Sequence, residues 1–149
     1  MMKPHLLKTA LIAPALALVA LGSASCKKHK DAGCQVNMAS LSGTYRLTAL
    51  KYKASAGATE QDALSWREAC ENDDLIILKS DGTYQYQDAG TACSPNGSDN
   101  GTWSVSGNTL SSDGDMQGTI KSFDCSTLVY TMTDLYNTGD QLSWTLTKQ

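Results

Sequence analysis

The cysteines are the residues of this chain that point most clearly to chemistry. Five are present, at positions 26, 34, 70, 93 and 125. No two of them are spaced as C-x-x-C, the spacing typical of zinc sites and thiol redox pairs. Cys26 ends an N-terminal signal described below, and the other four form an even set. In an exported domain, an even number of cysteines predicts two disulfides.

Histidine chemistry is excluded from most of the chain. The two histidines, His5 and His29, both precede residue 41. From residue 41 onward there is consequently no Ser-His-Asp or Cys-His arrangement and no zinc site built on histidine. A G-x-S-x-G motif and a Gly-rich phosphate loop are also absent. The sequence therefore predicts a protein that is not an enzyme and that has no metal or cofactor.

Carboxylates are the remaining chemical groups to weigh. Asp73-Asp74 and the Asp113-Gly114-Asp115 segment are the obvious pairs for a glycosidase that uses two acids. Both adjoin expected turns, where Asp commonly accepts local hydrogen bonds. The second segment could also bind calcium, but the ligand spacing of a calcium loop is incomplete. We favour a role in the turns for both.

The N-terminal segment has the layout of a secretory signal. Lys3 and Lys8 make its start positive, residues 10–22 are almost wholly apolar, and residues 23–25 are small. A permanent anchor helix is the alternative, but the apolar run is shorter than the roughly 20 residues that a span needs and contains Pro14. We expect residues 1–25 to be a lipoprotein signal peptide.

Ser23-Ala24-Ser25-Cys26 resembles the lipobox of bacterial lipoproteins. Ser23 stands where that motif usually has Leu, and the small residues would also suit an ordinary signal peptidase. The charged run at residues 27–30 is typical of a lipoprotein tether. The resemblance implies that Cys26 carries the lipid and binds the chain to a membrane. Lys27 is not an aspartate, which implies the outer membrane, and without an acidic run the periplasmic face is favoured over the cell surface.

Composition divides the rest of the chain into two parts. Residues 26–40 are the lipidated cysteine and a polar segment, expected to be a flexible tether. Residues 41–149 are long enough for one domain. This domain holds 7 Lys or Arg and 14 Asp or Glu, a net charge of −7. Nucleic acid is therefore not an expected partner. Separately, we expect the domain to be a monomer.

Short alternating segments separated by turn residues predict an all-β domain. Gly, Asn and Asp stand at the breaks, where they permit tight hairpins. The expected strands are residues 43–52, 74–79, 83–87, 101–106, 109–112, 116–122, 126–133 and 141–148. Eight antiparallel strands favour a small up-and-down barrel or a closed sandwich. One helix is expected between strands 1 and 2, at residues 60–70, because Thr59 and Asp62 form a start signal.

Two motifs carry a family resemblance. Gly43-Thr44-Tyr45 resembles the Gly-x-Trp that opens lipocalins, with Tyr in place of Trp. Residues 73–84, followed by Gly101-Thr102-Trp103, are similar to the lipocalin-like domains of bacterial lipoproteins. The resemblance covers nearly all of residues 41–149 and implies an eight-stranded lipocalin-like barrel. It implies a fold more than a function.

Strand order predicts how the four cysteines pair. In an up-and-down order, strand 2 begins at the end of the barrel where strand 3 finishes, which brings Cys70 to Cys93. A two-residue hairpin at Asp81-Gly82 would place these two cysteines opposite each other. Strands 1 and 7 both begin at the other end, which brings Cys34 to Cys125. Of three possible connectivities, we predict Cys70–Cys93 and Cys34–Cys125.

The aromatic residues of the strands either fill the barrel or line a pocket. We favour filling, because the domain is small and an eight-stranded barrel is barely wide enough for one small ligand. Under the pocket reading, the residues at the mouth would be Trp66, Tyr84, Tyr86 and Trp103. Trp66 lies on the expected helix, where it would contact a ligand or pin the helix to the barrel.

Two functions follow from these expectations. The first is a membrane-anchored lipoprotein that binds a small apolar ligand at the barrel mouth. The second is a protein-interaction module that acts through its loops, like the small barrel lipoproteins that inhibit periplasmic hydrolases such as lysozymes. The long polar loop at residues 94–100 and the net charge of −7, which would suit a basic partner, favour the second.

Overall fold

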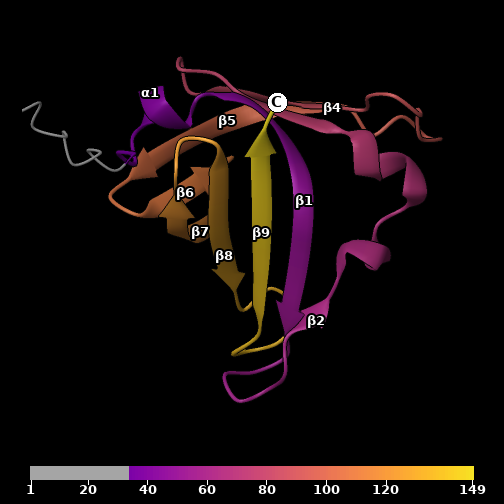
Figure 1. Cartoon of the computed structure of the whole chain (residues 1–149), viewed down its shortest axis with the longest axis vertical. Coiled ribbons are helices and arrows are strands. Elements are labelled where there is room, and N and C mark those ends of the chain that lie inside the picture. Colours follow the sequence, from indigo (N-terminus) through magenta and orange to yellow (C-terminus); the bar gives the residue numbers. More distant parts are fainter. Residues whose placement is uncertain (1–33) are drawn as a thin grey trace, which may run out of the picture. The chain divides into compact units, whose positions relative to one another are not determined.

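The structure, a computed structural model, describes residues 34–149, and β-strands make up most of the regular secondary structure of this segment (Figure 1). The predicted signal peptide, Cys26 and the first part of the predicted tether lie outside the described residues. None of the helices in the described part of the chain combines the length and the apolarity needed to cross a membrane. The elements are α1 (Met38–Leu41), β1 (Gly43–Lys53), β2 (Gln61–Asp62), η1 (Leu64–Trp66), η2 (Ala69–Asp73), β3 (Leu75–Leu78), β4 (Thr83–Gln87), β5 (Asp99–Ser106), β6 (Thr109–Ser112), β7 (Met116–Phe123), β8 (Thr127–Thr133) and β9 (Gln141–Lys148).

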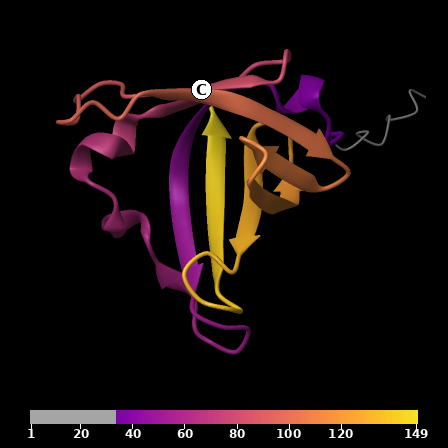
Figure 2. The same cartoon turned by 180° about the vertical axis from the view of Figure 1, so that it is seen from behind.

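Eight antiparallel strands close into an up-and-down barrel, as the sequence predicted. The sheet runs from β1 through β3 to β9 in chain order, and β9 pairs back with β1. The β1–β9 seam is visible at the centre of both views (Figures 1 and 2). β2 is a two-residue strand that pairs with β1 near the C-terminal end of β1. Closure leaves the long strands without a free edge, which explains why so small a sheet is stable.

The hairpins follow the turn residues, with one correction. Gly107-Asn108 forms the predicted two-residue turn between β5 and β6. The β3–β4 turn was predicted to have two residues, but it has three, because Lys79 pairs with Thr83 through its backbone N–H. Gly82, the last loop residue, has φ 87°, which glycine adopts without strain. The ladder is therefore shifted by one residue from the predicted register.

The predicted helix at residues 60–70 was wrong. The segment instead forms β2, then η1, and then the first part of η2. Ala63 is fully buried between β2 and η1, and its N–H donates to the carbonyl of Leu50 on β1. Because pairing with β1 satisfies the backbone here, a continuous helix is not needed. Within residues 34–149 the α-helix is α1, which precedes β1 and spans the predicted boundary at residue 40 between the tether and the domain.

Both disulfides have the predicted pairing. Cys34–Cys125 joins the segment before α1 to the β7–β8 turn, and Cys70–Cys93 joins η2 to the β4–β5 loop. Neither pair sits in a strand ladder, so the bonds form despite the shifted β3–β4 register. The two disulfides lie at opposite ends of the barrel, because the β7–β8 and β4–β5 connections are at opposite ends.

One end of the barrel is closed by α1. Leu41 on α1 and Tyr45 on β1 are fully buried, and the Tyr45 hydroxyl donates to the Leu41 carbonyl at 2.7 Å. The Lys148 ammonium donates to the Ser40 carbonyl and lies 5.5 Å from the centre of the Tyr45 ring.

Candidate functional site

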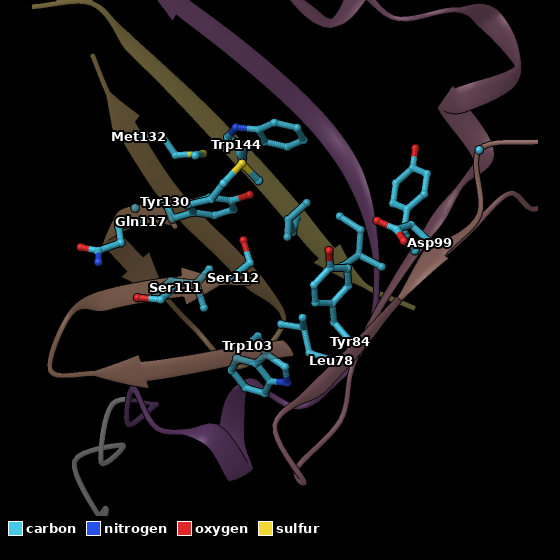
Figure 3. A pocket seen from close by; sticks show the side chains of 17 residues that line it. Leu78, Tyr84, Asp99, Trp103, Ser111, Ser112, Gln117, Tyr130, Met132 and Trp144 are labelled. Atoms are coloured by element: carbon cyan, nitrogen blue, oxygen red, sulfur yellow. The ribbon is translucent and has the colours of Figure 1, made fainter. Parts of the chain in front are cut away.

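A cavity of about 320 Å³ occupies the barrel toward the end opposite α1 (Figure 3). We expected the aromatic side chains to fill the interior, but several of them line this cavity instead. The wall is largely apolar and comes from seven of the eight barrel strands. Its side chains include Ile76, Leu78, Tyr84, Tyr86, Trp103, Leu110, Met116, Tyr130, Met132, Trp144 and Leu146. The inward face of every strand except β1 therefore contributes to one shared site.

Strands β8 and β9 provide a stacked aromatic part of the wall. Tyr130 and Trp144 face each other across the two strands, with ring centres 6.0 Å apart and planes 12° apart. Gly118 on β7 leaves room for the tyrosine, because an added Cβ would lie 2.7 Å from its ring. Apolar residues alternate with polar ones along β9 and at the end of β8, as expected for strands with one face toward the barrel interior. Burial raises the pKa of Tyr130, so its hydroxyl stays neutral at ordinary pH.

Tyr84 is fixed by a carboxylate on a neighbouring turn. Its hydroxyl donates to Asp113 at 2.6 Å, and the same carboxylate accepts the N–H of Thr102 at 2.8 Å. Gly101 is required at this point, because an added Cβ would lie 2.2 Å from the Asp113 carboxylate. The hydrogen bond to Asp113 and partial burial raise the pKa of Tyr84 to about 12. The same bond lowers the pKa of Asp113.

Tyr86 belongs to a second, more buried network. Its hydroxyl donates to Asp74 at 2.6 Å and accepts from the Arg67 guanidinium at 2.6 Å. Asp74 is only 4% exposed, and it also accepts the N–H of Ala89 in the β4–β5 loop. Arg67 lies 3.8 Å from Asp74 and 3.7 Å from Glu71. These bonds tie η2 and the β4–β5 loop to the strand that carries Tyr86.

The four aromatic residues predicted for the mouth do not all meet. Tyr84, Tyr86 and Trp103 line the cavity, and the Trp103 indole N–H donates to the Lys79 carbonyl at 2.8 Å. Trp66 does not line it. Trp66 is 53% exposed, and the centre of its ring lies 5.1 Å from that of Tyr52, near the C-terminal end of β1.

The acidic groups considered for catalysis act mainly as hydrogen-bond acceptors for the loops. Asp73 accepts the N–H of Thr91, whereas Asp74 and Asp113 fix the two tyrosines. Within residues 34–149, the group that best matches a set of metal ligands is Glu68, Cys70 and Cys93. Its two sulfurs form a disulfide, so they cannot serve as thiolate ligands.

Sequence reasoning missed several lining residues and the Arg67 network. Asp99 lines the cavity at the start of β5, two residues before the predicted start of that strand. Leu128, Tyr130 and Met132 occupy alternate positions along β8, and this alternation was the available signal for an inward-facing wall. No local pattern predicts that Arg67 and Asp74 meet at Tyr86, because this depends on how the connection from β2 to β3 folds back.

A family model described as a lipocalin-like domain matches residues 41–144. No curated protein matches the chain.

Proposed function

Since this chain belongs to the lipocalin-like domain family, we propose that its domain binds a small apolar molecule in the barrel cavity. The observation that carries the proposal is the cavity itself. At about 320 Å³ it lies at the small end of the range for ligand sites, and its wall is mainly apolar and aromatic. Transfer of an apolar ligand from water to such a wall is favourable in proportion to the area buried.

The residues around the cavity support binding rather than turnover. In the described part of the chain, its lining contains serine, tyrosine and one aspartate, but no histidine, cysteine or lysine. Among the described residues, neither the Ser111 nor the Ser112 hydroxyl is hydrogen-bonded to a base that could activate it, and the neighbouring Asp113 instead accepts from Tyr84 and Thr102. The two fixed tyrosines donate to carboxylates and keep raised pKa values, so they are poor proton donors at neutral pH.

Native mass spectrometry tests the proposal. The chain from residue 27 onward would be exported to an oxidising compartment and purified gently. We expect a bound adduct that leaves on denaturation. Ser112→Phe, which places a ring in the cavity, should abolish the adduct, whereas Ser104→Phe on the exposed face of β5 should retain it. A ligand retained equally by both variants would place binding outside the cavity.

We also propose that the domain is anchored through a lipid on Cys26, facing the periplasm from the outer membrane. The lipobox-like Ser23-Ala24-Ser25-Cys26 segment and the charged residues after it support this. The mass of the N-terminal peptide would reveal the acyl chains, and Cys26→Ser should prevent their addition. Protease added to intact cells should leave the domain uncut. Cleavage there would place it on the cell surface.

A second candidate, a protein-interaction module, is favoured by an exposed aromatic cluster. Trp66, Tyr136 and Leu135 are 53%, 65% and 38% exposed, and both aromatic rings contact Tyr52. Exposed aromatic side chains of this kind are typical of interface hot spots. The cluster lies outside the cavity. Lysozyme and other basic hydrolases would be assayed with added protein, and inhibition lost in Trp66→Ala would support this function.

A further inference from the structure

The described lining of the cavity carries negative charge and no positive charge. Asp99 is the only charged residue in the described lining, and one of its oxygens accepts the N–H of Asn100. Within residues 34–149 the ion pairs are those of Arg67 with Glu71 and Asp74, so no basic side chain pairs with Asp99. A ligand that carries a carboxylate would therefore meet no cation in the wall and would face Asp99.

The two tyrosines near Asp99 add to this preference. Tyr84 and Tyr86 each donate their hydroxyl hydrogen to a carboxylate, Asp113 and Asp74 respectively. The hydroxyl of a tyrosine has one hydrogen, so neither ring has a donor left for a ligand. The Tyr84 oxygen can still accept, whereas the Tyr86 oxygen already accepts from Arg67. This part of the wall offers acceptors rather than donors, which suits a ligand that carries N–H groups.

The aromatic rings provide a second attraction for a cation. Tyr84 and Tyr86 line the cavity on β4, and Asp99 at the start of β5 is paired with Tyr86. Figure 3 shows Tyr84 and Asp99 on the same side of the cavity. A cation over the face of a tyrosine or tryptophan is attracted by the ring. Asp99 thus places a carboxylate beside aromatic faces at one end of an apolar space.

We propose that the cavity takes a small amphiphilic amine, with its apolar body in the barrel and its ammonium group at Asp99 and the adjacent tyrosines. This inference rests on the proposed function and names the ligand class for the same site. The apolar body would lie against Trp103, Tyr130 and Trp144. An uncharged molecule of the same shape would bind more weakly, and a carboxylate more weakly still.

Three matched probes test the ligand class by isothermal titration calorimetry. 4-Phenylbutylamine, 4-phenylbutan-1-ol and 4-phenylbutyrate share one body and differ in the charge of the head group. We expect the amine to bind about tenfold more tightly than the alcohol, from the ion pair and the cation–π contacts together. The acid should bind most weakly. Raised salt should reduce the advantage of the amine and leave the alcohol unchanged.

Two variants locate the head group. Asp99→Asn keeps an oxygen to accept the Asn100 N–H but removes the charge, and it should bring the affinity for the amine down to that for the alcohol. Asp115→Asn removes the same charge from an exposed turn residue that does not line the cavity. It should leave the advantage of the amine intact. An equal loss in both variants would overturn the role of Asp99.

The outcomes separate this inference from the proposed function. Equal binding of amine and alcohol, or tightest binding of the acid, would overturn the amine preference while leaving the cavity as a ligand site. If none of the probes binds, and Ser112→Phe does not alter the adduct seen by native mass spectrometry, both the inference and the proposed function fail.

Discussion

The two ends of the barrel are built differently. At the α1 end, Leu41, Tyr45 and Leu128 are fully buried and pack against one another in a filled core. At the other end, the strands enclose a cavity of about 320 Å³. The same eight strands build both ends, so the difference comes from the side chains and from the segments that cap them.

The tyrosine hydroxyls show what this difference means. At the filled end, Tyr45 donates to a backbone carbonyl of α1. At the cavity end, Tyr84 and Tyr86 donate to carboxylates from a turn and a connecting segment. Apolar packing reaches both ends, because the cavity-lining Leu78, Trp103 and Leu146 belong to the same buried core as Tyr45. The cavity end has, in addition, hydrogen bonds between side chains around its rim. A rim fixed by polar bonds can surround an empty space without collapsing into it.

The disulfides give the largest expected losses of stability at the two ends. Cys34–Cys125 spans 91 residues and Cys70–Cys93 spans 23. From loop length alone, replacing each pair with serine should lower the free energy of unfolding by about 4.6 and about 3.4 kcal/mol respectively. Urea unfolding measures both values. A larger loss from the Cys70–Cys93 pair would mean that the cavity end holds more of the domain's stability than its packing suggests.

Leucine truncation tests the filled end against the cavity. Leu41→Ala should cost about 2–5 kcal/mol, because it opens a hole in a packed core. Leu110→Ala should cost less than about 2 kcal/mol, because Leu110 is half-buried and already faces the cavity. Thermal unfolding and probe binding would be measured together. Only the second variant should change the affinity for a ligand.

The hydroxyls of the two rim tyrosines, Tyr84 and Tyr86, should contribute different amounts to the free energy of unfolding. Tyr86→Phe removes the hydroxyl that donates to the buried Asp74 and accepts from Arg67. We therefore expect a loss of about 1–3 kcal/mol in the free energy of unfolding. Tyr84→Phe affects the exposed Asp113, which keeps its bond to the Thr102 N–H. Its cost should be smaller. Equal losses in urea unfolding would contradict the distinction between a buried and an exposed network.

The smallest expected effect is the dependence of stability on alkaline pH. The folded-state pKa of Tyr84, about 12, lies above the ordinary value of 10.0. Its contribution to stability is therefore complete below pH 10 and is lost as the pH rises toward 12. Burial also raises the pKa of Tyr45, so both ends weaken in alkali. Urea unfolding across this range should show a smaller fall in Tyr84→Phe than in the unmodified chain.

The strands were predictable because each follows from local alternation and from a turn residue at its end. Thr83–Gln87, Thr109–Ser112 and Gln141–Lys148 have the predicted bounds, and the others differ by at most two residues at either end. The segment at residues 60–70 was not predictable in this way. Its capping signal favours a helix, but pairing with β1 and burial of Ala63 outweigh that weak local preference.

By itself, the sequence determined the strand order, the inward faces, the number of disulfides and the absence of histidine chemistry from residue 41 onward. These depend on residue type, spacing and neighbouring turns. Only the tertiary structure decided that the interior is hollow at one end and that Arg67, Asp74 and Tyr86 meet. Whether a barrel is filled depends on how side chains from eight strands and α1 fit together in three dimensions, which no single segment encodes.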